Sequence, residues 1–240
     1  LGDGLKGTDN ENRIGPTRAI QSGKITIRAM KIAVILCTFL TLISGLTLLF
    51  IALDTGWKFF ALLSIGILAI AASIKYTIGK NAFGYHVFGD LFVFVFFGLV
   101  GVLGTIYLQS KAIDWLDFLP AIAVGMLCAG VLNLNNMRDF KNDTASNKRT
   151  LVVILGLSTA RVYHLIITLL PIFLFTFYLI KVQSGYDALL LLIPFVLLLS
   201  AIKRVYHISK EEDLDPELKK LALTTFLTAI LFTFSLAIEI

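Results

Sequence analysis

Long apolar runs, separated by short polar segments, dominate the pattern of this chain. Seven of the runs approach or exceed the length that a helix needs to cross about 30 Å of hydrocarbon. They cover residues 31–53, 59–75, 90–109, 116–134, 162–180, 187–203 and 219–238. Pro171 and Pro194 fall inside two of them, where neighbouring helices can satisfy the backbone groups that a proline leaves unpaired. The pattern therefore predicts an all-α, polytopic transmembrane helix bundle.

The composition supports a membrane protein and excludes two other classes. Apolar residues make up 57% of the 240 residues and charged residues 15%, with a mean hydropathy of +0.86. A soluble domain of this size would leave too much of that apolar surface in water. A disordered chain is excluded because its hydrophobicity would be low rather than high.

Lysine and arginine are concentrated in alternate polar segments. Residues 1–31, 75–89, 135–161 and 203–220 hold 18 of the 21 basic residues. The intervening segments hold the other three: Lys58, Lys111 and Lys181. Because cytoplasmic loops of membrane proteins are rich in Lys and Arg, the four basic segments are predicted to face the cytoplasm. This sorting explains the net charge of +5 without a nucleic-acid partner.

The first candidate site is the first acidic segment, residues 3–18. Asp3 and Asp9 lie six residues apart, across Gly4 and Gly7. This spacing does not place them on one face of a straight helix; it suits a helix end that passes into a glycine-containing turn. A solvated acidic loop between membrane helices is the alternative interpretation.

The second candidate site is the second acidic segment, residues 133–151. Its Asn135, Asp139 and Asp143 share one face if the segment is helical. Carboxylates four residues apart repel each other on a bare helix, so a divalent cation between them would explain the pattern. Oxygen ligands beside phosphate-binding groups suit Mg²⁺. Basic residues able to hold phosphate oxygens lie close by: Arg138, Lys148 and Arg149.

Together the two acidic segments predict a metal-bridged diphosphate site at the cytoplasmic rim of the bundle. The apolar helices below would hold a hydrocarbon tail, and a diphosphate with such a tail is a polyprenyl diphosphate. The alternative for the second acidic segment is a helix-capping cluster with topology-determining charges. That segment directly continues a membrane span, where polar groups are costly, and this favours a ligand site. We therefore expect its carboxylates to serve a ligand rather than packing.

At these residues the chain resembles the UbiA superfamily of intramembrane aromatic prenyltransferases, and within it the branch that prenylates 1,4-dihydroxy-2-naphthoate. Asp3 and Asp9 match the end of the first family motif. Further similar stretches are Arg13–Thr26 (RIGPTRAIQSGKIT), Tyr76–Lys80 (YTIGK), Gly84–Tyr107 and Asn135–Leu151, which contains NNMRD. The similarity covers essentially the whole chain. The superfamily has nine spans, so we expect residues 1–240 to be one prenyltransferase domain, with seven of its spans present and the first two missing.

The resemblance implies a Mg²⁺-dependent transfer of a polyprenyl group from polyprenyl diphosphate to 1,4-dihydroxy-2-naphthoate with loss of CO₂, giving demethylmenaquinone. This reaction belongs to menaquinone biosynthesis and implies a multi-pass protein in the lipid bilayer of a bacterial inner membrane. The implied metal ligands are Asp3, Asp9, Asn135, Asp139 and Asp143. The implied diphosphate-binding residues are Arg13, Arg18, Lys80, Arg138 and Lys148. Besides the four aspartates, Tyr76 is implied in catalysis, because Tyr76 or Tyr107 could stabilise an allylic carbocation.

Other interpretations stay open at this point. Another acceptor, 4-hydroxybenzoate or homogentisate, would need the same diphosphate site. A transporter would also place carboxylates at helix ends, although it would usually carry more polar residues near the middle of its spans. Tyr76 alone could be a membrane-interface residue, and Lys80 and Arg18 could be topology charges.

Overall fold

The structure, a computed structural model, describes residues 1–10, 13–80, 82–182 and 185–237, of which residues 186 and 187 are described in their backbone alone. Its helical elements follow one another as α1 (Gly2–Lys6), α2 (Ile27–Ala52), α3 (Trp57–Thr77), η1 (Phe83–Tyr85), α4 (Gly89–Val93), η2 (Phe94–Leu103), α5 (Gly104–Ser110), η3 (Trp115–Asp117), α6 (Phe118–Arg138), α7 (Phe140–Ala145), α8 (Leu151–Lys181), η4 (Tyr186–Leu191), α9 (Leu192–His207), η5 (Glu211–Asp213) and α10 (Leu214–Ala237). Seven helices or helix runs among them are long and apolar enough to cross a membrane. The predicted seven-span helical bundle is confirmed.

The main difference from the predicted spans is the start of the fifth. α8 begins at Leu151 rather than near residue 162, because its first two turns are a separate helical piece. The Thr150 hydroxyl accepts a hydrogen bond from the Val153 N–H (3.3 Å) and caps this piece. The helix then bends at Gly156, whose φ of 75° is in the left-handed region. Arg161, which interrupts the apolar run in the sequence, donates to the carbonyl of Ile208.

The prolines occupy different helical positions. Pro171 lies inside α8, as the span prediction requires. Pro194 is the third residue of α9, directly after the 3₁₀ turn η4. An N–H in the first turn of a helix has no intrahelical partner, so proline costs little there. Pro194 lies within the span Ala188–His207, as predicted, at the point where its 3₁₀ start passes into α9.

The core of the bundle forms around α6, which packs against α8, η2 and α10. α6 and η2 approach closely at Gly98 and Gly125. A Cβ atom added to Gly98 would lie 2.6 Å from the Cα of Gly125 and 2.6 Å from the Ala121 carbonyl oxygen. Only glycine allows this contact, which fixes the position of the span beginning at Gly89 relative to the second acidic segment.

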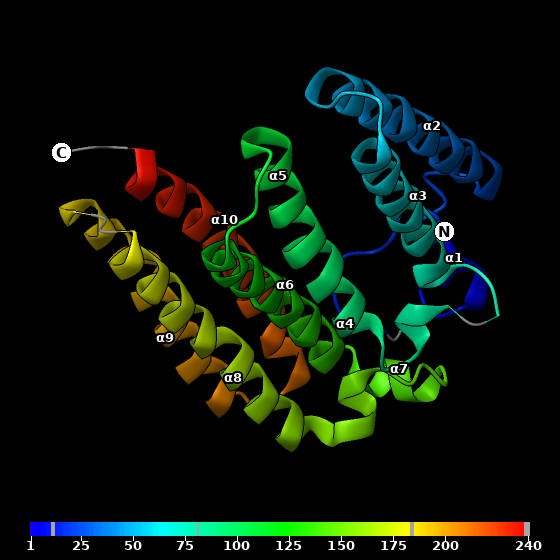
Figure 1. Cartoon of the computed structure of the whole chain (residues 1–240). Coiled ribbons are helices and arrows are strands. Elements are labelled where there is room, and N and C mark those ends of the chain that lie inside the picture. The colour runs from blue at the N-terminus through cyan, green and yellow to red at the C-terminus, as the bar shows by residue number, and fades with distance from the viewer. Residues whose placement is uncertain (11–12, 81, 183–184, 238–240) are drawn as a thin grey trace.

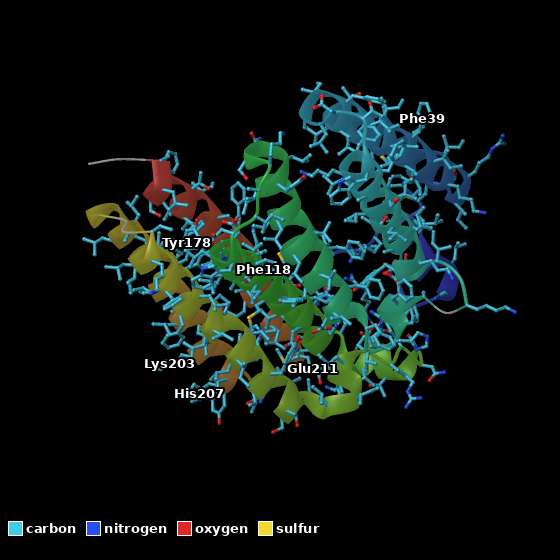
Figure 2. All side chains as sticks on the ribbon, in the orientation of Figure 1. Phe39, Phe118, Tyr178, Lys203, His207 and Glu211 are labelled. Carbon is cyan, nitrogen blue, oxygen red and sulfur yellow. The ribbon has the colours of Figure 1, made fainter. Side chains whose placement is uncertain are left out.

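α2 and α3 form an outer hairpin that packs mainly with itself (Figure 1). Its large apolar side chains point away from the bundle, and Phe39 is one of them (Figure 2). Outward-facing apolar residues are what a lipid environment requires. At one end of the bundle, α1, the start of α4 and α7 gather beside the last turn of α3 (Figure 1). A Cβ at Gly2 would lie 2.5 Å from Thr77, so α1 rests directly on α3.

Candidate functional site

Asp3 is held by a tyrosine from a distant segment. The Tyr85 hydroxyl donates to Asp3 Oδ1 at 2.8 Å and also lies 2.5 Å from Thr8 Oγ1. The ammonium group of Lys6 lies 3.7 Å from the centre of the Tyr85 ring. Burial raises the pKa of the Tyr85 hydroxyl above its ordinary value, and the Asp3 charge raises it further while Thr8 opposes the shift. Tyr85 therefore stays protonated and serves as a hydrogen-bond donor to Asp3.

Asp9 lies among arginines. Its Oδ1 is 3.7 Å from Arg13 Nε and 3.9 Å from Arg18 Nε. The same Arg13 Nε lies 3.7 Å from Asp139 Oδ2, which belongs to the second acidic segment. Arg13 is almost buried, with a side chain 8% exposed. The structure thus brings the two acidic segments together through one arginine.

Asp139 terminates a helix instead of continuing one. α6 ends at Arg138 and α7 starts at Phe140, so Asn135, Asp139 and Asp143 do not lie on one uninterrupted helix. Arg138 is buried and grips Asp139 with two hydrogen bonds, Nε to Oδ1 and Nη2 to Oδ2, both 2.9 Å. This bidentate pair shows that Asp139 takes part in packing, contrary to the expectation that it serves only a ligand.

Arg138 also contacts residues outside this pair. Its Nη2 donates to Asn135 Oδ1 at 2.9 Å, and its Nη1 donates to Asp215 Oδ1 at 2.6 Å. Gly15 lies over the guanidinium: its φ is 103°, and a Cβ there would lie 3.3 Å from Arg138 Cζ. Four of the five guanidinium N–H groups are therefore engaged.

Asp143 is buried with one oxygen partly unsatisfied. Lys148 Nζ donates a hydrogen bond to Asp143 Oδ1 at 3.3 Å, and it lies 3.2 Å from Asp143 Oδ2. The second contact is close enough for charge attraction but lacks hydrogen-bond geometry, so Oδ2 has no donor among the described residues. Burial raises the pKa of Asp143 to about 6; Lys148 opposes the shift, and the charges of Asp139 and Asp3 add to it. Three carboxylates from both acidic segments therefore act on one another.

Backbone contacts hold these segments in place. The side-chain amide of Asn142 donates to the Thr8 carbonyl at 3.0 Å. The Arg149 N–H donates to the Tyr85 carbonyl at 3.0 Å. Three polar segments from distant parts of the sequence thus form one rim above the helices.

Sequence reasoning missed several of these contacts. Asp215 and Tyr85 hold predicted site residues directly, Thr8 contacts Tyr85 and Asn142, and none of the four was assigned a role. Charge alternation placed Asp215 at the same end of the bundle as the acidic segments, because it lies in the basic segment 203–220. It did not indicate that Asp215 faces Arg138, 77 residues earlier.

The remaining predicted residues lie at different depths. Lys80 is exposed in the turn after α3, across a shallow depression from Lys6. Tyr76, in the last turns of α3, packs against Gly84 and Gly89 below the rim. Tyr107 lies near Lys58, which stands at the opposite end of α3 from Tyr76. The alternative of Tyr107 as a carbocation-stabilising residue is therefore wrong: the two ends of this 21-residue helix are about 30 Å apart.

An apolar cavity of about 480 Å³ opens between α3 and the span that starts with α4. It is lined by Ala69, Ala72, Ser73, Tyr76, Phe92, Val93, Phe96 and Phe97. The ring of Phe92, on its wall, stacks on Phe83 with ring centres 4.2 Å apart, and its centre lies 5.9 Å from that of Phe96. Tyr76 lines this cavity and lies close to the rim, so the cavity begins near the carboxylates.

The residues present fit a divalent cation in their chemistry. Within the described ranges, no three His, Cys, Asp or Glu side chains surround a common metal position. The donors are nevertheless carboxylate and amide oxygens, which hard cations prefer. The buried Asp143 Oδ2 lacks a donor, and its carboxylate feels the charges of Asp139 and Asp3. A bound cation would satisfy the Asp143 oxygen and reduce the repulsion between the carboxylates.

Comparisons with known proteins give a consistent result. The sequence pattern described as "UbiA prenyltransferase family" matches residues 6–227. A Haemophilus influenzae protein named 1,4-dihydroxy-2-naphthoate octaprenyltransferase is 39% identical over 237 residues, which cover 99% of this chain and 77% of that protein. The protein of the same name from Escherichia coli is 39% identical over 235 residues, or 96% and 75% of the two chains. That from Mycobacterium tuberculosis is 40% identical over 162 residues, or 68% and 53%. No solved structure matches the chain significantly.

Proposed function

The chain belongs to the UbiA prenyltransferase family, and on this premise we propose that it transfers a polyprenyl group from polyprenyl diphosphate to 1,4-dihydroxy-2-naphthoate, with loss of CO₂. The product is a demethylmenaquinone. The names of its 39–40% identical relatives supply the acceptor and an octaprenyl donor for the proposal. The residues 1–240 act as one transmembrane domain in it.

One observation carries the proposal: a rim of carboxylates and arginines lies at the mouth of an aromatic-lined apolar cavity. Arg13 joins Asp9 to Asp139 at the rim, and Tyr76 lies on the cavity wall directly below. A prenyl diphosphate has the same division, with a multiply charged head and an apolar tail. A transporter would usually carry more polar residues near the middle of its spans.

Mg²⁺ is the proposed cofactor, and five residues provide oxygen ligands for it. They are Asp3, Asp9, Asn135, Asp139 and Asp143. When bound, the ion neutralises the diphosphate and stabilises it as a leaving group. Asp143 and Asp3 have the most to gain from a cation, because Asp143 has an unsatisfied buried oxygen and Asp3 is held by the neutral Tyr85 hydroxyl.

The basic residues have two kinds of role in the proposal. Arg13, Arg18, Lys80 and Lys148 bind diphosphate oxygens and favour departure of the leaving group. Arg138 adds positive charge and at most one further N–H, because its other N–H groups hold Asp139, Asn135 and Asp215. Its main contribution is to fix Asp139.

Below the rim, the chain's side chains protect the reacting centre. Departure of diphosphate leaves positive charge on the allylic carbon, and the Tyr76 ring stabilises it by cation–π attraction. The apolar cavity wall keeps water away from that carbon, because water would otherwise attack the cation and give an alcohol. The electron-rich naphthoate ring then forms the new carbon–carbon bond, and its carboxylate leaves as CO₂.

The experiment is an assay of membranes that contain the protein with octaprenyl diphosphate and Mg²⁺. We expect 1,4-dihydroxy-2-naphthoate to give a prenylated product without its carboxylate, identified by mass, and one CO₂ per product. Chelation of the metal should stop the reaction. Prenylation of 4-hydroxybenzoate with its carboxylate retained, and none of the naphthoate, would support a different acceptor. No prenylated product with any aromatic acceptor would contradict the proposed function.

The proposed setting is a bacterial inner membrane, with the rim facing the cytoplasm. The excess of Lys and Arg on the polar segments of that side supports it. In a variant without Cys37 and Cys128, single cysteines at Ser146 and Thr55 should react from opposite sides with a membrane-impermeant reagent. Reaction of both from one side would contradict this topology.

A further inference from the structure

A third carboxylate site lies outside both acidic segments. Asp90 is in the first turn of α4, and it is 4% exposed. Its Oδ2 has no hydrogen-bond donor among the described residues. A buried carboxylate oxygen without a donor is unfavourable if nothing binds it, and the diphosphate site described above does not use Asp90.

The surroundings of Asp90 are two tyrosines from different helices. Tyr163 of α8 lies close enough to Asp90 for its hydroxyl to interact with the carboxylate. Tyr76 of α3 lies on the other side: a Cβ added to Gly89 would be 3.4 Å from the Tyr76 hydroxyl. The next turn of the same span contributes Phe92 and Val93 to the apolar cavity that Tyr76 also lines. Asp90 is therefore placed between the charged rim and the cavity.

A purely structural role explains only part of this arrangement. A carboxylate in the first turn of a helix interacts favourably with the helix dipole, by about 0.3–1 kcal/mol at an exposed position. That interaction requires neither burial nor an unsatisfied oxygen. The second carboxylate oxygen, in contrast, suits a hydroxyl donor supplied by a ligand.

We propose that Asp90 is a catalytic residue that binds the ring hydroxyl of the aromatic acceptor and removes its proton. This inference rests on the proposed function and extends it to the acceptor. As the O–H bond breaks, the proton goes to the Asp90 carboxylate, and its electron pair enters the ring. The bond between the allylic carbon and diphosphate has by then broken, with its electron pair leaving on diphosphate, and the ring carbon bonds to the allylic carbon. After CO₂ leaves, the electron pair of the broken bond forms an enolate, whose oxygen takes the proton back from Asp90.

The test is Asp90→Asn, which keeps the size of the side chain and removes its basicity. We expect prenylated product to form about 10²-fold more slowly, the range typical of a lost general base. Slow hydrolysis of octaprenyl diphosphate without acceptor should stay within twofold of the wild-type rate, because the diphosphate site is intact. Asp54→Asn, at an exposed position on the opposite side of the membrane, is the matched control and should match the wild type in both assays.

A second readout separates proton removal from a structural role. With acceptors whose ring hydroxyl is made more acidic by fluorine, the difference between wild type and Asp90→Asn should shrink, because the proton is then lost without help. Asp90→Glu should recover part of the rate. A wild-type rate for Asp90→Asn, a defect that is independent of acceptor acidity, or an equal loss of diphosphate hydrolysis would overturn the inference. Failure of the wild type to prenylate any acceptor would instead contradict the proposed function.

Discussion

The two acidic segments hold their carboxylates in different ways. In the second, Asp139 receives two hydrogen bonds from the buried Arg138, and Asp143 is buried beside Lys148. In the first, Asp9 lies 3.7–3.9 Å from its arginines, and Asp3 accepts a hydrogen bond from the neutral Tyr85 hydroxyl. Charge pairing is tight on one side of the site and loose on the other.

The backbone shows the same contrast. The second acidic segment consists of the end of α6, the whole of α7 and the capped start of α8. The first is irregular after α1, and it turns through positive φ angles at Gly7 and Gly15. We therefore predict that one half of the site is built by folding, whereas the other half closes on its ligand. Loops that bind ligands are commonly the less stable parts of a protein.

The strongest test of this contrast compares two arginines. Arg138→Ala removes a buried cation, leaves Asp215 without its charge partner and leaves Asp139 with only the longer contact to Arg13, so we expect the free energy of unfolding to fall by about 3–5 kcal/mol. Arg18→Ala removes a side chain that is 54% exposed and should cost less than about 1 kcal/mol. Thermal unfolding in detergent measures both. Equal losses would show that the two segments are held equally firmly.

The next prediction concerns turnover. Asp143→Asn keeps the size of the side chain and removes both a buried charge and its repulsion with Asp139 and Asp3. These gains offset the lost ion pair with Lys148, so the protein should fold about as stably as the wild type. Loss of an oxygen anion from the proposed metal site should lower turnover by about 10²–10³-fold. Octaprenyl diphosphate and the naphthoate acceptor provide the assay, and unfolding in detergent provides the control. A stable variant with normal turnover would remove Asp143 from the site.

The fold was predictable from the sequence because the thickness of the bilayer sets the length of each apolar run. The predicted ends of the spans were wrong where a charged residue lies inside a helix. Arg161 is tolerated within α8 because it donates a hydrogen bond to the carbonyl of Ile208. Glu217 is buried in α10, which starts five residues before the predicted residue 219, because Arg204 and Lys220 pair with it at 2.8 and 2.7 Å. A hydropathy pattern counts these charges as ends of spans and contains no information on their partners.

The meeting of the two acidic segments at one end of the bundle was predictable from the sequence, but the pairing of their side chains was not. Charge alternation placed both acidic segments at one rim. It did not indicate that Arg13 lies between Asp9 and Asp139, or that Asp215 reaches Arg138. Such contacts depend on how the helices pack, and the local sequence pattern around each residue contains no information on that packing. The buried Asp90 was overlooked for the same reason: in the sequence it is one acidic residue at the start of a span.

Gly15 offers a way to separate the two segments without changing a charge. Gly15→Ala would be strained, because the φ of Gly15 is 103°. It would also be crowded, because the added Cβ would lie 3.3 Å from Arg138 Cζ. We expect a cost of about 1–3 kcal/mol and a weaker affinity for octaprenyl diphosphate, because Arg13 moves away from Asp139. Gly23→Ala is the control, since its φ of 71° gives the same kind of strain with open space around it. If both variants lose the same affinity, contact between the segments does not contribute to binding.

The smallest effect is expected from Tyr85→Phe, which removes the hydroxyl that links Asp3 and Thr8 and changes nothing in the second acidic segment. A single hydrogen bond to a carboxylate contributes about 1.5–3 kcal/mol at most when it is buried, and Asp3 is only half-buried. We therefore expect a loss of about 1 kcal/mol or less in global stability. Hydrogen exchange should show faster exchange in α1 and unchanged protection in α7, because Lys148 and Arg138 still hold their partners there. Mg²⁺ should restore the protection of α1, since a cation on Asp3 replaces the missing donor. Faster exchange in both helices would mean that the two segments move as one unit, and the contrast between a built half and a closing half would then be wrong.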